Sequence, residues 1–260
     1  MLKIATWNVN SVKVRLPHVL DWLRTAAPDV LLLQEIKTPE ESFPRLELEG
    51  AGYHSLIHGQ KGYNGVAIVS RRPLVETARI LPGAADDAEA RYIEARIEGT
   101  GGVCVASLYL PNGNPVDGEK FPYKLSWMAR LRDHAKTLLH RGETVVLGGD
   151  YNVCPTDDDV YAPEQWTDNA LCRREVREAF RSLLWLGYTD AFRAFNHAPG
   201  AYTFWDYQAG AWQRNLGLRI DHLLLSPQAA DRLEACAIDT EPRGRDKPSD
   251  HTPIWCTLRE

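Results

Sequence analysis

The chain has 260 residues, of which 44% are hydrophobic and 25% charged, and its formal net charge is -5. This composition allows a sizeable buried core. No apolar run reaches the roughly 20 residues of a membrane-spanning helix, and the first residues, MLKIATWNVN, do not have the basic and apolar regions of a secretion signal.

Apolar runs of strand length and segments with helical spacing follow one another along the chain, bounded mostly by Gly, Pro, Asn or Asp. In chain order, we predict a strand at 3–7, a helix at 16–27, strands at 30–33, 65–70, 92–97 and 103–109, a helix at 121–140, a strand at 144–148, a helix at 173–186, and strands at 219–226 and 253–258. This mixture favours a layered α/β domain with much antiparallel sheet.

Neither a Pro/Ser-rich linker nor a block of charge divides the chain, so residues 1–260 are predicted to form a single domain. The polar segment 154–172, which carries three consecutive aspartates, is predicted to be a long surface loop. Two pairs of runs, KIATWNVN with VVLGGDYNV and GVAIVS with DHLLLS, suggest two pseudo-repeated halves, although such short matches also arise by chance.

The five cysteines are odd in number and show no CxxC spacing. This pattern indicates reduced thiols that pack in a cytoplasmic protein, and it disfavours a disulfide framework or a zinc site. The net charge of -5 neither supports nor excludes a nucleic-acid substrate, because basic residues can still gather locally where phosphates pass. We expect a monomer, since no spare apolar helix is apparent.

Polar residues that could form a site lie at the end of an apolar run or inside one. They are Asn8, Glu35, Asp150, Asn152, Asp221, Asp250 and His251. A buried charge is unfavourable unless it is paired or bound to a metal. Several such residues that can converge at one edge of a sheet are therefore better explained as a site than as separate salt bridges.

Carboxylate and amide oxygens dominate this set, and ligands of this kind suit Mg²⁺ or Mn²⁺ and disfavour zinc. Such ions polarise phosphoryl oxygens and lower the pKa of a bound water. An adjacent Asp and His can add a base and a cationic hydrogen-bond donor. The residues alone therefore predict attack of water on a phosphoester.

Each residue taken singly also has a plainer explanation. Glu35 could form a salt bridge with Lys37, and Asp150 could cap the turn that follows its two glycines. Asp250 could cap a turn before a strand. Tyr109, which precedes the turn sequence PNG, could be a half-buried strand tyrosine.

The chain contains, in order, TWNVNS, LLQEIK, GYNGVAIVS, YLPNG, GGDYNV, YTFWDY, GLRIDHLLLS and KPSDHTPIW. This series resembles the exonuclease III family of abasic-site endonucleases from residue 3 to about residue 258. QE, GDxN and SDH alone indicate only the wider endonuclease/exonuclease/phosphatase superfamily, whereas YTFWDY and GLRIDHLLLS are more particular. The resemblance implies a four-layered α/β sandwich, with two packed, mostly antiparallel sheets flanked by helices and a site at one edge.

The resemblance also implies a role for each polar residue. The expected metal site comprises Asn8, Glu35, Asp150, Asn152, Asp250 and His251, with Glu35 as the principal Mg²⁺ ligand. The expected catalytic residues are Tyr109, Asp150, Asn152, Asp221 and His251. Among these, Asp150 would activate the attacking water, Asn152 would orient it, and His251, held by Asp221, would donate to the scissile phosphate.

Substrate contacts are implied as well. Asn112, with Tyr109, would contact phosphate oxygens. Phe204, Trp205 and Leu218 match the apolar residues that hold a flipped base-less sugar, although they could be ordinary core residues. Arg173, Arg174 and Arg177 fall at helical spacing and could face DNA phosphates or simply form a solvated helix face.

The activity implied is magnesium-dependent DNA repair on double-stranded DNA. The enzyme would cut 5′ to abasic sites and remove nucleotides or blocking groups from 3′ ends, leaving a 3′-hydroxyl. The alternatives are a superfamily relative that acts on an inositol phosphate or on sphingomyelin, a non-specific DNase, and a non-catalytic module. The last of these would be expected to lose site residues, and none of the expected ones is missing.

Overall fold

The computed structural model describes residues 1–260, and its core is two six-stranded sheets. Sheet A runs in the order β11 (Leu233–Ile238), β12 (Ile254–Leu258), β1 (Leu2–Asn8), β2 (Val30–Gln34), β4 (Val66–Ser70) and β3 (His54–His58). Sheet B runs in the order β5 (Leu74–Ala78), β6 (Tyr92–Ile97), β7 (Cys104–Tyr109), β8 (Val145–Asp150), β10 (Asp221–Leu225) and β9 (Thr189–Asp190). Only the β1–β2 and β7–β8 pairs are parallel.

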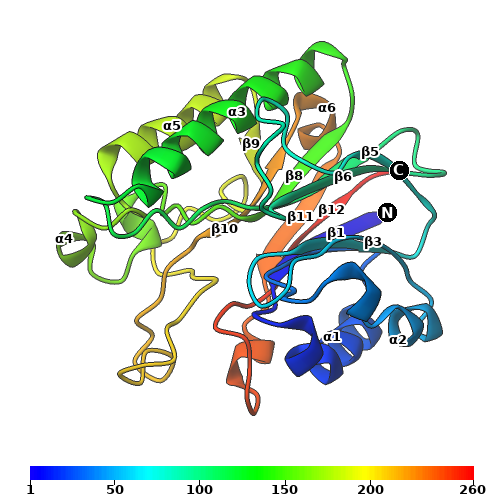
Figure 1. Cartoon of the computed structure of the whole chain (residues 1–260), viewed down its shortest axis with the longest axis horizontal. Helices are drawn as coiled ribbons and strands as arrows, with labels where there is room; N and C mark the ends of the chain where they lie inside the picture. The colour runs from blue at the N-terminus through cyan, green and yellow to red at the C-terminus, as the bar shows by residue number, and fades with distance from the viewer.

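Helices cover the outer faces of both sheets, which gives four layers (Figure 1). The α-helices are α1 (Val12–Ala26), α2 (Arg45–Gly50), α3 (Lys120–His140), α4 (Pro163–Trp166), α5 (Arg174–Trp185) and α6 (Pro227–Ala230). Short 3-10 turns are η1 (Glu40–Ser42), η2 (Asp157–Asp159) and η3 (Glu241–Gly244). The expected four-layered sandwich is confirmed. None of these helices combines the length and apolarity needed to cross a membrane.

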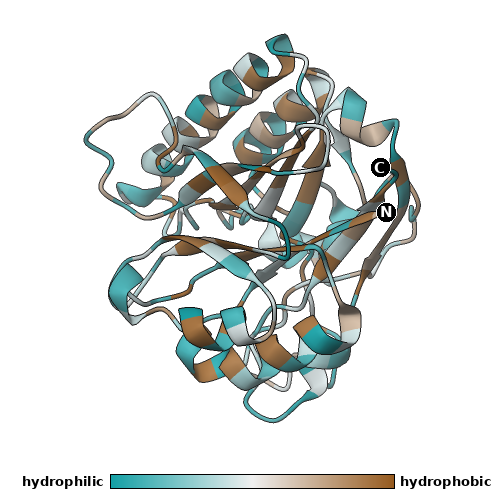
Figure 2. Ribbon diagram, turned by 90° about the vertical axis from the view of Figure 1, so that its right-hand side faces the viewer, coloured by the Kyte–Doolittle hydropathy of each residue, from teal (hydrophilic) through white to brown (hydrophobic).

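The period-two alternation of each strand divides its side chains between two cores. In β1, Leu2 and Ile4 lie between the sheets, whereas Ala5 and Trp7 face α1. Trp7 meets Trp22 of α1 edge to face, with ring centroids 6.1 Å apart. Hydrophobic residues accordingly concentrate on the strands, and the helices are hydrophilic on much of their length (Figure 2).

The two sheets have the same spatial arrangement of strands. In each, a helix joins two parallel central strands, β1–α1–β2 in sheet A and β7–α3–β8 in sheet B. The strand orders then correspond throughout, with β4 equivalent to β10 and β3 to β9. The similar runs GVAIVS and DHLLLS lie on equivalent strands, whereas KIATWNVN and VVLGGDYNV do not.

The prediction for segment 154–172 was wrong in one respect. The segment contains η2 and α4, and its Cys154, Leu171 and Cys172 are buried in a small hydrophobic cluster. The Asp159 carboxylate is fully buried and accepts hydrogen bonds from Arg219, at 2.7 Å, and from Arg193, at 2.5 Å. A polar sequence therefore packs inside because its charges are paired. All five cysteines are free thiols, as expected.

Candidate active site

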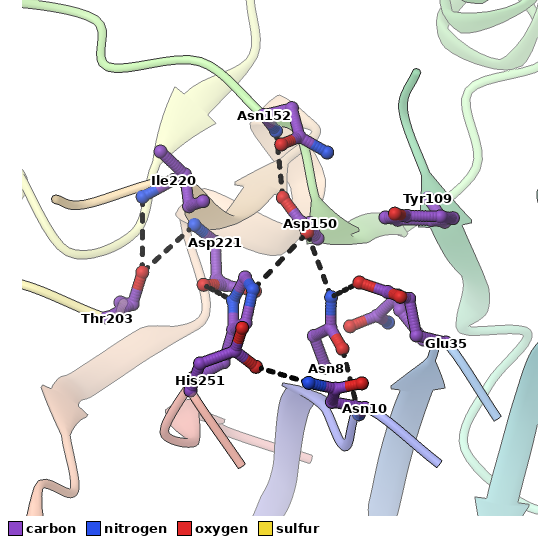
Figure 3. A network of polar contacts seen from close by, with 12 residues as sticks. Asn8, Asn10, Glu35, Tyr109, Asp150, Asn152, Thr203, Ile220, Asp221 and His251 are labelled. Carbon is purple, nitrogen blue, oxygen red and sulfur yellow. Dashed lines mark hydrogen bonds and ion pairs between the residues drawn. The ribbon is translucent and has the colours of Figure 1, made fainter. Parts of the chain in front are cut away.

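The strand ends bring the expected polar residues to one edge of the sandwich (Figure 3). Asn8, Tyr109 and Asp150 are the last residues of β1, β7 and β8, and Glu35 directly follows β2. Asp221 begins the antiparallel strand β10, so it lies opposite Asp150 in the β8–β10 ladder. Parallel central strands with antiparallel neighbours thus place all these side chains at the same end.

The two glycines before Asp150 allow the close packing that carries it there. A Cβ atom on Gly148 would lie 2.5 Å from Leu32 of the facing sheet. A Cβ on Gly149 would lie 1.9 Å from the Leu108 carbonyl oxygen. The GGD sequence therefore reflects the close approach of backbone expected before an acidic strand end.

Non-glycine residues of the site have left-handed backbone conformations, among them Glu35 with φ 47° and Asn152 with φ 49°. Such conformations are unfavourable for residues other than glycine, least so for asparagine, and they concentrate at functional sites. The Ser11 amide donates to the Glu35 carbonyl at 2.7 Å, and the Ile36 amide donates to Gly65 at 3.1 Å. These bonds hold the turn that directs the Glu35 carboxylate into the site.

Glu35 and Asp150 are bridged by one amide. Asn8 donates from Nδ2 to Glu35 Oε1 at 2.8 Å and to Asp150 Oδ2 at 3.0 Å. The Asn8 oxygen Oδ1 accepts from the backbone of Asn10 instead, so it does not face the carboxylates. Lys37 lies 2.9 Å from Glu35 Oε2. Burial raises the pKa of Glu35, but the Lys37 ammonium and the Asn8 amide outweigh it and leave this pKa below its usual value.

His251 lies between two buried carboxylates. Its Nδ1 is 2.8 Å from Asp221 Oδ2, and its Nε2 is 3.7 Å from Asp150 Oδ2. Burial alone would lower the pKa of His251, but the charges of Asp221 and Asp150 raise it to about 10. Burial raises the pKa of Asp150 to about 7, against the opposing effect of the His251 charge. The imidazole is therefore protonated near neutral pH and can donate from Nε2.

The donor set fits a divalent cation. Ligand atoms of Glu35, Asp150 and His251 all lie within 4.8 Å of one another. The raised pKa of His251 favours a charged ring that donates a hydrogen bond, and the carboxylates of Glu35 and Asp150 are oxygen ligands of the kind that suits Mg²⁺. The carboxylates of Glu35 and Asp150, 2.8 and 3.0 Å from one shared amide, also repel one another, and a cation between them would remove that repulsion.

Asp250 and Asn152 take different places. Asp250 Oδ1 accepts from Asn10 Nδ2 at 3.0 Å and lines the same cavity as Glu35, but it lies outside the Glu35, Asp150 and His251 group. The backbone amide of Asn152 donates to Asp150 Oδ1 at 2.9 Å, and its side-chain amide donates to the Leu110 carbonyl. Asn152 is therefore placed to hold Asp150 in position.

A cavity of about 290 Å³ opens beside these groups. Tyr109 and Asn112 line one wall, and Asn112 Nδ2 donates to Asn152 Oδ1 at 3.0 Å. Phe204 and Leu218 form an apolar part of the wall, with the Phe204 ring centroid 5.0 Å from that of His251. Polar donors and an apolar wall thus meet around one small cavity.

Trp205 lies elsewhere. It is 2% exposed, donates from Nε1 to Asn215 at 3.0 Å, and packs with Tyr202 and Trp212 around a separate apolar cavity. Alternation along the YTFWDY segment explains this, since neighbouring residues of an extended chain point to opposite sides. The structure thus brings Phe204 to the cavity and directs Trp205 into the protein.

The three arginines expected to contact phosphates do not line the cavity. Arg173 pairs with Glu175 at 3.2 Å, Arg174 with Glu178 at 2.6 Å, and Arg177 with Asp157 at 2.8 Å. These contacts partly neutralise the charges that would attract DNA phosphates. Their contact with DNA remains a prediction.

Sequence reasoning missed three contributors. Asn10 links Lys37, at 2.6 Å, to Asp250. Thr203 Oγ1 accepts from the backbone amides of Ile220 and Asp221, both at 3.1 Å, which fixes the start of β10 (Figure 3). Lys124 donates to three backbone carbonyls beneath the cavity. Of the three, only Lys124 could have been noticed in the sequence. It is a charged residue at helical spacing from the apolar residues Met128 and Leu131 of α3.

Two packed sheets flanked by helices, with paired carboxylates and a buried Asp–His pair at one edge, define a metal-dependent phosphoesterase fold and site. The chain belongs to the endonuclease/exonuclease/phosphatase family, whose model matches residues 5–251. Within that family the resemblance to exonuclease III is confirmed. The chain is 34% identical to exodeoxyribonuclease III of Haemophilus influenzae over 268 aligned residues, covering 99% of this chain and 100% of the relative.

Solved structures agree with this placement. An AP endonuclease from Archaeoglobus fulgidus superposes with a TM-score of 0.95 at 37% identity, with full coverage of both chains. The 3′ phosphatase NExo from Neisseria, bound to product DNA hairpin, superposes with a TM-score of 0.95 at 41% identity, also with 100% coverage of both chains.

Proposed function

We propose that this chain is a magnesium-dependent DNA repair nuclease that hydrolyses the phosphodiester 5′ to an abasic site and also processes 3′ ends of duplex DNA. The chain is a phosphodiester hydrolase of the exodeoxyribonuclease III kind. One observation carries the chemistry: Glu35 and Asp150 converge on the same point as a His251 imidazolium held by Asp221. The relatives named exodeoxyribonuclease III and AP endonuclease support the DNA substrate.

In this proposal, Glu35 is the principal ligand of Mg²⁺, and the bound ion would polarise the scissile phosphate and neutralise developing charge. Asp150 accepts the proton of the attacking water. Asn152 holds Asp150 Oδ1 through its backbone amide, which leaves Oδ2, the oxygen that accepts from Asn8, on the side of His251. His251 donates from Nε2 to a phosphate oxygen, because Asp221 keeps the ring charged and fixes Nδ1 as the donor toward itself.

The abasic specificity rests on the apolar wall. Phe204 and Leu218 lie at the cavity beside His251, where a sugar without a base could enter next to the scissile phosphate. Tyr109 and Asn112, on another wall of the same cavity, are placed to contact phosphate oxygens.

A second activity has support from one relative. The Neisseria structure is named a 3′ phosphatase and holds product DNA. Removal of a 3′ phosphate and incision at an abasic site both need water attack on a phosphate ester beside a sugar. The same Asp150 and His251 would serve either reaction.

A panel of labelled substrates tests the proposal. The panel comprises a duplex with one tetrahydrofuran abasic analogue, a 3′-recessed duplex, a duplex with a 3′ phosphate, and an inositol polyphosphate, each with Mg²⁺ and with EDTA. We expect metal-dependent incision immediately 5′ to the analogue and metal-dependent turnover of at least one 3′ end. Turnover of the inositol polyphosphate without DNA cleavage would overturn the proposal.

A further inference from the structure

Lys124 is a buried lysine that the chemistry above does not use. It lies in the second turn of α3 and is 0% exposed. Its neighbours at helical spacing, Met128 and Leu131, belong to the hydrophobic core between α3 and sheet B. A charged side chain on this face is unfavourable unless all of its donors are paired.

The ammonium is satisfied by backbone alone. It donates to the carbonyl oxygens of Asn112 at 3.1 Å, Asn152 at 2.6 Å and Ala170 at 3.0 Å, and it forms no ion pair with a carboxylate. A lysine ammonium has three N–H donors, so donors and acceptors match in number. A guanidinium or an amide could not reproduce this arrangement, because its donors lie in one plane.

These carbonyls belong to three separate segments that form the cavity. Asn112 and Asn152 line it directly, and Ala170 lies between two further lining residues, Asn169 and Leu171. Backbone bonds link these segments only in pairs, from the Leu110 amide to Asp150 at 2.8 Å and from the Cys154 amide to Leu171 at 2.9 Å. Lys124 is the one side chain that donates to all three. Lys124 is therefore the common anchor beneath the cavity wall.

The anchor also acts on the proposed base. The Asn152 backbone is held on both sides, since its amide donates to Asp150 Oδ1 and its carbonyl accepts from Lys124. Asn152 has the unfavourable φ of 49°, which a carbonyl bond of 2.6 Å can stabilise. The backbone of Gly113, next to Asn112, passes so close to Lys124 that a Cβ atom on Gly113 would lie 2.6 Å from Lys124 Cδ.

We propose that Lys124 is a positioning residue for catalysis, which fixes Asn152, and through it Asp150, together with the phosphate-facing Asn112. This inference rests on the proposed function. It predicts an effect on turnover and little effect on binding, because Lys124 contacts neither the cavity nor any surface that DNA could reach. A displacement of the base by a fraction of an ångström to about 1 Å lowers the rate by about 10- to 100-fold.

The experiment compares kcat and KM for incision of the abasic duplex at saturating Mg²⁺. Lys124→Met removes the donors at nearly constant volume, and Lys124→Gln is the second variant in case the first does not fold. Leu131→Ala, in the core on the same helix face, is the control for lost stability, and Lys136→Met, exposed on the same helix, is the control for lost charge. Melting temperatures are measured for every variant, and rates are taken well below them.

We expect kcat of the Lys124 variants to fall by about 10- to 100-fold with KM changed less than about 3-fold, while both controls keep wild-type kcat. A wild-type kcat in a folded Lys124 variant would overturn the inference. So would an equal loss in Leu131→Ala, or failure of both Lys124 variants to fold, since each assigns Lys124 to stability alone. An inactive wild-type protein would instead refute the proposed function.

Discussion

The Asp221–His251 pair allows a quantitative prediction for Asp221→Asn. The two groups are buried and 2.8 Å apart, so their attraction at an effective dielectric constant of ~20 is about 6 kcal/mol. Holding the pKa of His251 at about 10, compared with ~6.5 for a free imidazole, requires about 5 kcal/mol. This single contact is therefore large enough to account for the protonated ring.

The asparagine variant keeps a hydrogen-bond acceptor but loses the charge. Burial then lowers the pKa of His251 while Asp150, 3.7 Å away, raises it, so we expect a value near ~6.5. Because the pKa of His251 is raised, the protonated ring that donates the hydrogen bond persists at every pH below that pKa. This form is lost as the pH rises through the pKa. Wild-type His251 thus stays charged to about pH 10, whereas in the variant only ~3% would be charged at pH 8.

The assay is kcat for incision of a tetrahydrofuran-containing duplex at saturating DNA and Mg²⁺, measured from pH 6 to 8.5. The ratio of wild-type to variant kcat should be less than about 2 at pH 6 and about 30 at pH 8. Glu94→Gln is the matched control, because Glu94 also pairs with a buried histidine, His134 at 2.7 Å, remote from the site. A ratio that does not change with pH would refute the assignment of His251 as a charged donor.

Further variants test the metal and the substrate wall. Glu35→Gln should raise the half-saturating Mg²⁺ concentration by at least ~10-fold, measured by titrating incision with Mg²⁺. Glu41→Gln, at an exposed position, should leave this concentration unchanged. An unchanged half-saturating concentration in Glu35→Gln would exclude Glu35 as a ligand. Phe204→Ala should lower selectivity for abasic over intact duplex by ~10-fold or more, because Phe204 lines the cavity. Trp205→Ala should leave selectivity unchanged and lower the free energy of unfolding by ~3–5 kcal/mol, because Trp205 is buried away from this cavity. Loss of selectivity in Trp205→Ala but not in Phe204→Ala would show that Trp205, not Phe204, contacts the substrate.

The long buried elements could be predicted because burial imposes a period on the sequence. The predicted helix at 121–140 matches α3 within one residue, and the strands at 30–33 and 92–97 match β2 and β6 closely. Strands β3, β5, β9 and β11 were missed. They lie at sheet edges where side chains are largely exposed, as in LVETA, or they are only two residues long, so alternation is weak.

The candidate site residues could be singled out because a charge at the end of an apolar strand is unusual, and the structure places ligand atoms of Glu35, Asp150 and His251 within 4.8 Å of one another. What the sequence could not settle was orientation. Whether Phe204 or Trp205 faces the cavity depends on the register of an irregular segment. Arg177 pairs with Asp157, a carboxylate that sequence spacing alone does not bring to it. Lys124 acts through backbone carbonyls, which carry no side-chain signal.

The central claim is that Asp150 activates water for metal-dependent cleavage of DNA. Incision of a duplex with one abasic analogue by wild type and Asp150→Asn, with DNA affinity measured in parallel in Ca²⁺, tests it most directly. We expect wild type to cut immediately 5′ to the lesion only when Mg²⁺ is present. The variant should bind the duplex equally well and cut at least ~100-fold more slowly. A variant with near-wild-type kcat, or wild-type cleavage that persists in EDTA, would contradict the account.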